Sequence, residues 1–210
     1  MGKKQGMNRL MKQAGLVIIL NMIVVSAFAQ RADSAKAVIQ QDKNVKAKLV
    51  NGTPMLANLN IIENISRSKD YSILLNAIKA TGLTETFESK GPITIFAPTN
   101  SAFEKLPHGK LDSLLLPGNK YRLSSLITYH AIAGKVSIKD IAKNIRNHKG
   151  TATFITLAGS KIAATIDANR NIVLTDETGG RCVISRFDIA QKNGMLHVVN
   201  SVFIPKARVI

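Results

Sequence analysis

The stretch from Ile93 to Pro107, ITIFAPTNSAFEKLP, constrains the fold of this 210-residue chain more than any other. Its first four residues are β-branched or aromatic, which favours a buried strand, and Pro98 cannot continue a central strand because it has no backbone N–H. Asn100 or Ser101 can cap a following helix, which Pro107 closes after about two turns. The stretch therefore predicts a strand, a sharp corner and a short helix.

Two later segments add to this pattern: Tyr129-His130, followed by a glycine at 134, and the run NGMLHVVN at 193–200. The three motifs, in this order, resemble those of the fasciclin domain, an extracellular adhesion module, over about residues 59–205. The motif residues outside the Tyr-His segment are Thr94, Phe96, Pro98, Asn100, Phe103, Asp188, Asn193, Gly194 and His197.

The resemblance implies an α+β fold in which a compact β-sandwich or wedge core is surrounded by several short helices. It also implies that the closing motif pairs with the first strand of the sheet, and that the carboxylate of Asp188 accepts hydrogen bonds that fix the adjacent corner. We find no internal repeat, so the chain is expected to hold one copy of the module.

The hydrophobic periodicity agrees with an α+β domain. Apolar residues recur at helical steps up to about residue 147, and the spacing predicts helices beginning near 59, 70, 83, 111, 120 and 138. The helix at 120–132 carries His130 on its apolar side. From Thr151 the period changes to two, which predicts strands at 151–157, 161–166, 172–174, 182–187 and 196–204.

The N-terminus has the features of a secretory signal peptide. Four cations precede an apolar run from Leu16 to Phe28, and Ala27-Phe28-Ala29 fits a small-x-small cleavage site. A single membrane anchor is the alternative, although the apolar run is shorter than the ~20 residues of a spanning helix. We therefore expect a signal peptide at 1–29, a basic, flexible segment at 30–55, the domain at 56–206, a tail at 207–210 and no transmembrane span after cleavage.

The chain is strongly basic, with a formal net charge of +16 at pH 7. Removal of the leader, which has four cations and no acidic residue, leaves +12. Such a charge favours contact with anionic polysaccharide, acidic protein or a membrane surface. No specific nucleic-acid binding is expected, because the chain has no tryptophan and no evident aromatic platform for stacking bases.

The most concentrated basic segment is the helix predicted from Ser137, where Lys139, Lys143 and Arg146 lie away from an apolar stripe. These three cations are candidate binding residues, and an ordinary solvated helix face is the alternative. Tyr129 and His130 are also candidates, because the resemblance links the Tyr-His segment to cell attachment. A histidine in an apolar stripe is, however, more often buried with its ring nitrogens hydrogen-bonded.

The sequence offers no motif for catalysis. The four histidines lack metal-site spacing, and phosphate-loop, dinucleotide and nucleophile-elbow motifs are missing. We therefore expect no catalytic residue, metal or cofactor. Cys182 is the only cysteine, so it forms no internal disulfide; it is either a small buried side chain or a site of intermolecular cross-linking.

These observations predict a non-enzymatic, exported module that mediates adhesion or matrix attachment by binding an extracellular protein or anionic polysaccharide through its surface. The alternative is a periplasmic or extracellular small-ligand-binding protein or hydrolase with a pocket that the sequence does not reveal.

Overall fold

The computed structural model describes residues 46–89 and 91–206. The predicted signal peptide, most of the predicted basic segment (30–45) and the predicted tail (207–210) lie outside the described residues. Within the described residues, one compact unit begins at Lys46.

An N-terminal hairpin corrects the prediction that the chain stays flexible as far as residue 55. Strands β1 (Ala47–Val50) and β2 (Thr53–Leu56) pair antiparallel around Asn51-Gly52. Both turn residues have positive φ, 47° and 81°, which suits the twist of a two-residue hairpin turn. Val50 and Met55 are buried and β2 packs against strand β8 (Arg181–Gln191), so the domain starts about ten residues before the expected boundary.

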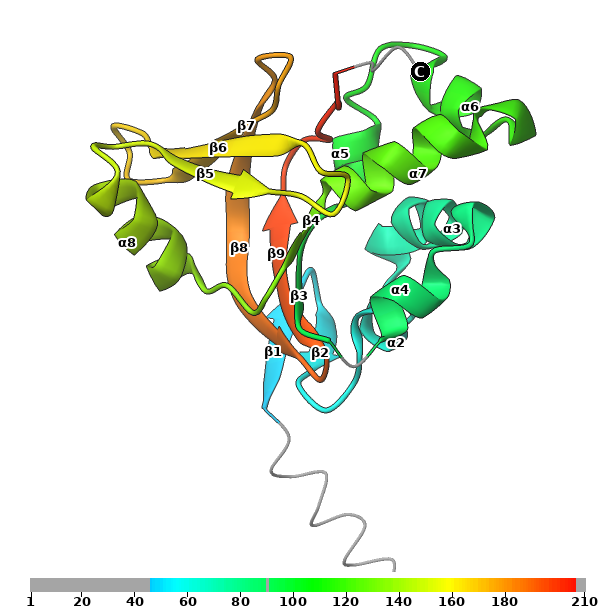
Figure 1. Cartoon of the computed structure of the whole chain (residues 1–210). Coiled ribbons are helices and arrows are strands. Elements are labelled where there is room, and N and C mark those ends of the chain that lie inside the picture. Colours follow the sequence, from blue (N-terminus) through cyan, green and yellow to red (C-terminus); the bar gives the residue numbers. More distant parts are fainter. Residues whose placement is uncertain (1–45, 90, 207–210) are drawn as a thin grey trace, which may run out of the picture. The chain divides into compact units, whose positions relative to one another are not determined.

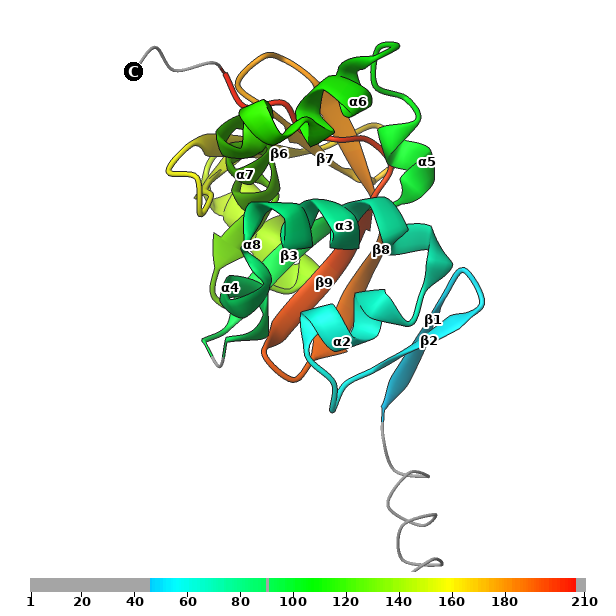
Figure 2. The same cartoon turned by 90° about the vertical axis from the view of Figure 1, so that its right-hand side faces the viewer.

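Three helices form a layer on one side of the sheet, as Figure 2 shows. They are α2 (Ile61–Ser66), α3 (Ser72–Thr81) and α4 (Thr84–Glu88), with a 3-10 turn, η1 (Lys69–Tyr71), between the first two. Helix α2 begins with a capping box between Asn60 and Glu63. Helix α3 ends at Gly82, whose φ of 78° is the left-handed conformation that glycine adopts readily after the last turn of a helix.

The strand and corner predicted at 93–107 are present. Strand β3 (Ile93–Pro98) is buried along its whole length, and α5 (Asn100–Phe103) follows at once. The predicted cap by Asn100 or Ser101 is wrong, because Thr99 occupies the N-cap position. The Asn100 side chain instead ties α5 to α3: Oδ1 accepts from the Ile73 N–H (3.1 Å) and Nδ2 donates to the Lys69 carbonyl (2.9 Å).

Helices α6 (Lys110–Leu115) and α7 (Lys120–Tyr129) come next, joined by the 3-10 turn η2 (Pro117–Asn119). The helix predicted at 120–132 ends three residues early, because Ala131–Ala133 forms strand β4 against β3. Backbone pairing with a buried strand thus overrides the helical spacing of the apolar side chains. Helix α8 (Ile138–Asn147) follows.

The second half of the chain is mostly sheet. Its strands are β5 (Ala152–Ile155), β6 (Lys161–Ile166), β7 (Ile172–Thr175), β8 (Arg181–Gln191) and β9 (Gly194–Val199). They join the earlier strands in the order β4-β3-β9-β8-β7-β6-β5. Strand β9 runs parallel to β3, with Ile93 opposite Gly194, so the closing motif pairs with the first strand as predicted. The last strand ends at residue 199 rather than 204.

The two edge strands of this sheet approach each other. Ile132 and Thr156 form an antiparallel bridge, and the Leu157 N–H donates to the Ala131 carbonyl oxygen (2.7 Å). The sheet is therefore a wedge that nearly closes into a barrel, as Figure 1 shows. The predicted α+β fold with a compact β core and surrounding helices is confirmed.

Two hydrophobic clusters hold the elements together. One lies between the α2–α4 layer, α7 and the buried strands β3 and β9. The other lies between α8 and strands β5 to β9, and includes Phe96, Tyr129 and Phe203. The Phe203 ring meets those of Phe96 and Tyr129 edge to face at centroid distances of 6.3 and 6.1 Å, which anchors the segment after β9 in the core.

Candidate functional site

Helix α8 presents a basic face. Ile141 and Ile145 are buried and hold the helix against β5 and β6, whereas Lys139, Lys143 and Arg146 are exposed. The three cations that the sequence predicted as binding residues therefore lie together on the solvent side of one helix. We call them the α8 basic face.

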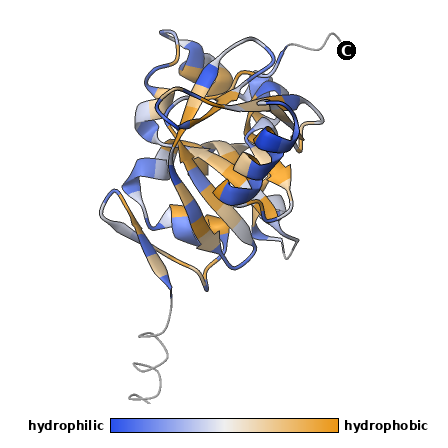
Figure 3. Cartoon of the chain, turned by 90° about the vertical axis from the view of Figure 1, so that its left-hand side faces the viewer, coloured by the Kyte–Doolittle hydropathy of each residue, from blue (hydrophilic) through white to orange (hydrophobic). Residues whose placement is uncertain are grey.

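Two neighbouring cations extend this charge, and the nearest acidic residue is engaged in capping the helix. Lys135 and Lys149, on either side of α8, are exposed. The Asp140 carboxylate accepts hydrogen bonds from the Ser137 hydroxyl (2.6 Å) and backbone N–H (2.9 Å), which lower its pKa. Figure 3 shows the left-hand side of Figure 1, which is the side where α8 lies. Strongly hydrophilic residues recur along that helix.

His130 lies in the interior and not at a contact surface. Its exposed fraction is 0%, its Nδ1–H donates to the Leu126 carbonyl (2.8 Å) and its Nε2 accepts from the Phe203 N–H (3.0 Å). These partners require the neutral ring with the proton on Nδ1, and burial lowers the pKa of His130 to about 4. His130 thus joins the end of α7 to the C-terminal segment.

Tyr129 is also buried and has a structural environment. Its hydroxyl donates to the Lys161 carbonyl (2.8 Å) and accepts from the Glu177 N–H (3.0 Å). Burial raises the pKa of the Tyr129 hydroxyl to about 12. Because neither Tyr129 nor His130 reaches the surface, their side chains do not offer the contact site that the resemblance implied.

The closing motif is a set of buried hydrogen bonds. His197 Nδ1 accepts from the Asp188 N–H (3.3 Å), its Nε2–H donates to the Val136 carbonyl (2.9 Å), and burial lowers its pKa. The Asp188 carboxylate accepts from the Ile138 N–H (2.8 Å), in line with its predicted role at this corner. Asn193 holds the other end of β9, where its side chain accepts from the Ile61 N–H (3.0 Å) and donates to the Phe87 carbonyl (2.7 Å).

The remaining motif residues support the same sheet. Thr94 Oγ1 donates to the Gly134 carbonyl (2.7 Å) and accepts from the Val136 N–H (2.8 Å), and Phe96 stacks on the His197 ring at 5.8 Å. Phe103 is buried in the helical cluster. The predicted structural motif therefore forms the frame that places β3, β9 and the start of α8.

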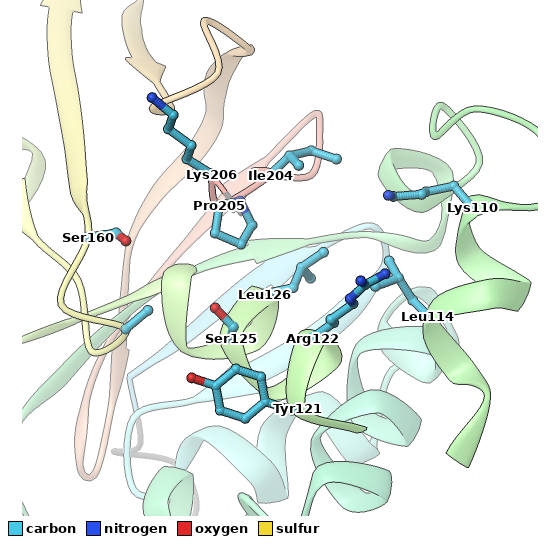
Figure 4. A pocket seen from close by; sticks show the side chains of 11 residues that line it. Lys110, Leu114, Tyr121, Arg122, Ser125, Leu126, Ser160, Ile204, Pro205 and Lys206 are labelled. Carbon is cyan, nitrogen blue, oxygen red and sulfur yellow. The ribbon is translucent and has the colours of Figure 1, made fainter. Parts of the chain in front are cut away.

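A cavity of about 530 Å³ lies elsewhere, between α6, α7, the loop after β5 and the segment after β9. Figure 4 shows its lining. Leu114, Leu126, Ala158, Ile204 and Pro205 supply apolar surface, Tyr121, Ser125 and Ser160 supply hydroxyls, and Lys110, Arg122 and Lys206 supply positive charge. None of these residues was singled out as a site by sequence.

The described residues contain no candidate metal centre and one buried cysteine. Among them, no three His, Cys, Asp or Glu side chains gather closely enough to hold a metal ion. Cys182 is buried, its Sγ lies 3.1 Å from the Ser201 carbonyl oxygen, and burial raises its pKa to about 11. A thiol in this state is a packing residue, because the nucleophilic thiolate is suppressed.

The family assignment follows from comparison with known proteins. The Fasciclin domain family model matches residues 69–205, which include β3, the Tyr-His segment and β9. The chain belongs to the fasciclin domain family.

Relatives of this fasciclin domain differ in size. Protein sll1483 of Synechocystis sp. is 29% identical over 169 residues, covering 80% of this chain and 86% of that protein. Human periostin is 31% identical over 141 residues, covering 67% of this chain but only 15% of periostin. A FAS1 domain pair from the insect cell adhesion molecule fasciclin I has the same fold, with a TM-score of 0.60 at 16% identity. The match covers 69% of this chain and half of that chain.

The cavity of this fasciclin domain has no local signal in the sequence. Its lining comes from two helices, one loop and the chain after the last strand, which are far apart in sequence. The apolar residues among them follow the same pattern as ordinary core residues.

Within residues 46–89 and 91–206, no helix is long and apolar enough to cross a bilayer.

Proposed function

We propose that this chain is an exported, non-enzymatic fasciclin domain that mediates adhesion or matrix attachment by binding an anionic extracellular polymer through the α8 basic face. The polymer is an acidic polysaccharide or the acidic surface of an extracellular protein. The predicted signal peptide directs export, and cleavage near Ala29 releases the processed chain. The observation that carries the proposal is the exposure of Lys139, Lys143 and Arg146 together on one helix that the core holds rigidly in place.

Three features support this role. The α8 cations extend from a helix fixed by buried Ile141 and Ile145, so they are positioned before a partner arrives. The net charge of the chain attracts a polyanion at long range. A domain of this family also occurs in the insect cell adhesion molecule fasciclin I and in periostin, which fits a binding module better than a catalyst.

The test is a binding titration of the processed chain with heparin and with alginate, which carry sulfate and carboxylate groups respectively. Replacement of Lys139, Lys143 and Arg146 by alanine should weaken binding at least tenfold near 0.1 M salt and flatten its dependence on salt concentration. Circular dichroism of the variant should be unchanged, because all three side chains are exposed.

A matched control separates local charge from total charge. Arg67, Lys79 and Lys192 are exposed cations outside α8, and replacing them by alanine removes the same three positive charges. This control should bind nearly as well as the unmodified chain. Equal losses in the two triple variants would reject the α8 basic face and leave only non-specific attraction.

A further inference from the structure

The cavity beside α6 and α7 is separate from the α8 basic face. Its described lining comes from α6, α7, the loop after β5 and the segment after β9, and none of it belongs to α8. At about 530 Å³ its volume is in the range of small-molecule sites, about 300–1,000 Å³. What it can bind is independent of the adhesion role proposed above.

The floor of the cavity is apolar. Leu114 and Leu126 are buried side chains of α6 and α7, and Ile204 and Pro205 add half-buried apolar surface from the segment after β9. Water over such a surface has few groups to bond with, so a ligand that covers the floor with hydrocarbon gains from displacing it. The floor therefore favours an alkyl chain or another extended apolar group.

The charged residues around this floor are all positive. Lys110, Arg122 and Lys206 line the cavity, and no aspartate or glutamate is among its described lining residues. In Figure 4 the side chains of Lys110 and Arg122 both lie to the right of Pro205. Neither makes a side-chain hydrogen bond or ion pair to another described residue, so both can turn to an anionic group.

The same lining is poorly suited to a sugar or another polyhydroxylated ligand. Aspartate, glutamate, asparagine and glutamine, which can accept hydrogen bonds from several hydroxyl groups, are missing from the described lining, whose only side-chain acceptors are the hydroxyls of Tyr121, Ser125 and Ser160. The exposed Tyr121, with 71% of its surface accessible, adds an aromatic rim that is compatible with an alkyl chain. The apolar floor and the cationic edge together match a molecule with an alkyl chain and one anionic end.

We propose that this cavity binds a free anionic amphiphile, whose alkyl chain covers Leu114, Leu126 and Pro205 and whose carboxylate or sulfate head group pairs with Lys110 and Arg122. Lys206, on the segment after β9, supplies additional positive potential. The chain thereby has a small-ligand site besides its proposed polymer-binding face.

The experiment is calorimetric titration of the full processed chain with dodecanoate below its micelle concentration. Dodecanol provides the same alkyl chain without charge, and acetate provides the head group alone. We expect saturable one-to-one binding of dodecanoate, at least tenfold weaker binding of dodecanol and no measurable binding of acetate. Replacement of Lys110 and Arg122 by glutamine should weaken dodecanoate binding at least tenfold and leave dodecanol binding unchanged.

Two further variants keep the test specific. Lys139→Gln with Lys143→Gln removes two charges from α8 and should leave dodecanoate binding intact. Ser125→Phe places a ring in the cavity from a half-buried position of α7, and should reduce the binding of both alkyl ligands. An amide NMR spectrum of each variant reports whether the domain is folded.

The proposal is overturned by any of three results. They are no saturable binding of dodecanoate, equal binding of dodecanoate and dodecanol, or equal affinity for dodecanoate in the Lys110/Arg122 variant and the unmodified chain. In the first case, sedimentation with phosphatidylglycerol vesicles would show that the surface recognises a bilayer and not a free molecule.

Discussion

His130 makes a quantitative prediction about stability and pH. In the folded chain its Nδ1–H donates to the Leu126 carbonyl and its Nε2 accepts from the Phe203 N–H, so both ring nitrogens are used in the neutral form. A proton added to Nε2 would break the bond from Phe203 and place a charge in a fully buried site. The folded state should therefore resist protonation until the pH is far below the ordinary pKa of a histidine.

The magnitude follows from the two pKa values. Burial lowers the pKa of His130 from 6.5 to about 4, whereas the ring titrates near 6.5 when the chain is unfolded. Above pH 6.5 the ring is neutral in both states and its contribution to stability is complete. As the pH falls from 6.5 towards 4, only the unfolded chain takes up the proton, so the free energy of unfolding decreases by about 3 kcal/mol.

The assay is urea unfolding at a series of pH values from 8 to 4, for the unmodified chain and for His130→Gln. The glutamine amide can accept the Phe203 N–H but does not titrate. The variant should be less stable at pH 8, because the Leu126 carbonyl loses its donor, yet its stability should fall about 3 kcal/mol less between pH 8 and 4. His197 and the carboxylates titrate in both proteins, so the difference between them isolates His130.

The control is His108→Gln, at an exposed position. It should keep the pH dependence of the unmodified chain. The reasoning would be refuted if His130→Gln showed the same pH dependence as the unmodified chain, or if NMR titration of the His130 ring gave a pKa near 6.5.

Three other positions give sharp expectations. Gly194→Ala should abolish soluble folded protein or lower the melting temperature strongly, since a Cβ there would overlap the Ile93 carbonyl oxygen of the adjacent parallel strand; a melting temperature within a few degrees of the unmodified chain would contradict this. Tyr129→Phe should cost about 1–3 kcal/mol in urea unfolding, because it leaves two backbone groups without their partner; an unchanged midpoint would show that water replaces both bonds. Cys182 should react with iodoacetamide only when urea unfolds the chain; rapid alkylation of the native chain would show that the thiol is accessible.

Much of the fold could be predicted from local patterns. The β-branched run at 93–96, the proline at 98 and the change of period after residue 151 are properties of neighbouring residues, and they correctly indicate a buried strand, a corner and a sheet-rich second half. The start of α8 at Ser137, whose side chain caps the helix, was predictable for the same reason. The pairing of β9 with β3 came from the family resemblance, because a parallel contact between residues about 100 positions apart has no local signal.

The failures have physical reasons. Strand β4 has three residues and continues the apolar spacing of α7, so only its hydrogen bonds to β3 distinguish it from helix. The β1–β2 hairpin lies in a lysine-rich segment, and the burial of Val50 and Met55 depends on partners elsewhere in the domain. Asn100 fits a capping pattern in sequence, but α3 supplies better hydrogen-bond partners from a distant part of the chain.

The candidate sites also differ in whether local sequence predicts them or only the folded chain reveals them. Exposure of Lys139, Lys143 and Arg146 was predictable because the apolar stripe of α8 fixes which side faces the core. The burial of Tyr129 was not, since its hydroxyl partners lie on β6 and in the turn after β7. The cavity depends on four separated segments, and so it could be found only in the folded structure.

The central claim, that the α8 basic face contacts an anionic extracellular polymer, is tested most directly by NMR. The ¹⁵N-labelled processed chain is titrated with a heparin oligosaccharide, and amide shift changes are mapped along the chain. The account predicts that the largest changes fall in residues 135–149 and disappear in the Lys139/Lys143/Arg146 alanine variant. Changes centred on other parts of the domain, or unaltered changes in that variant, would contradict it.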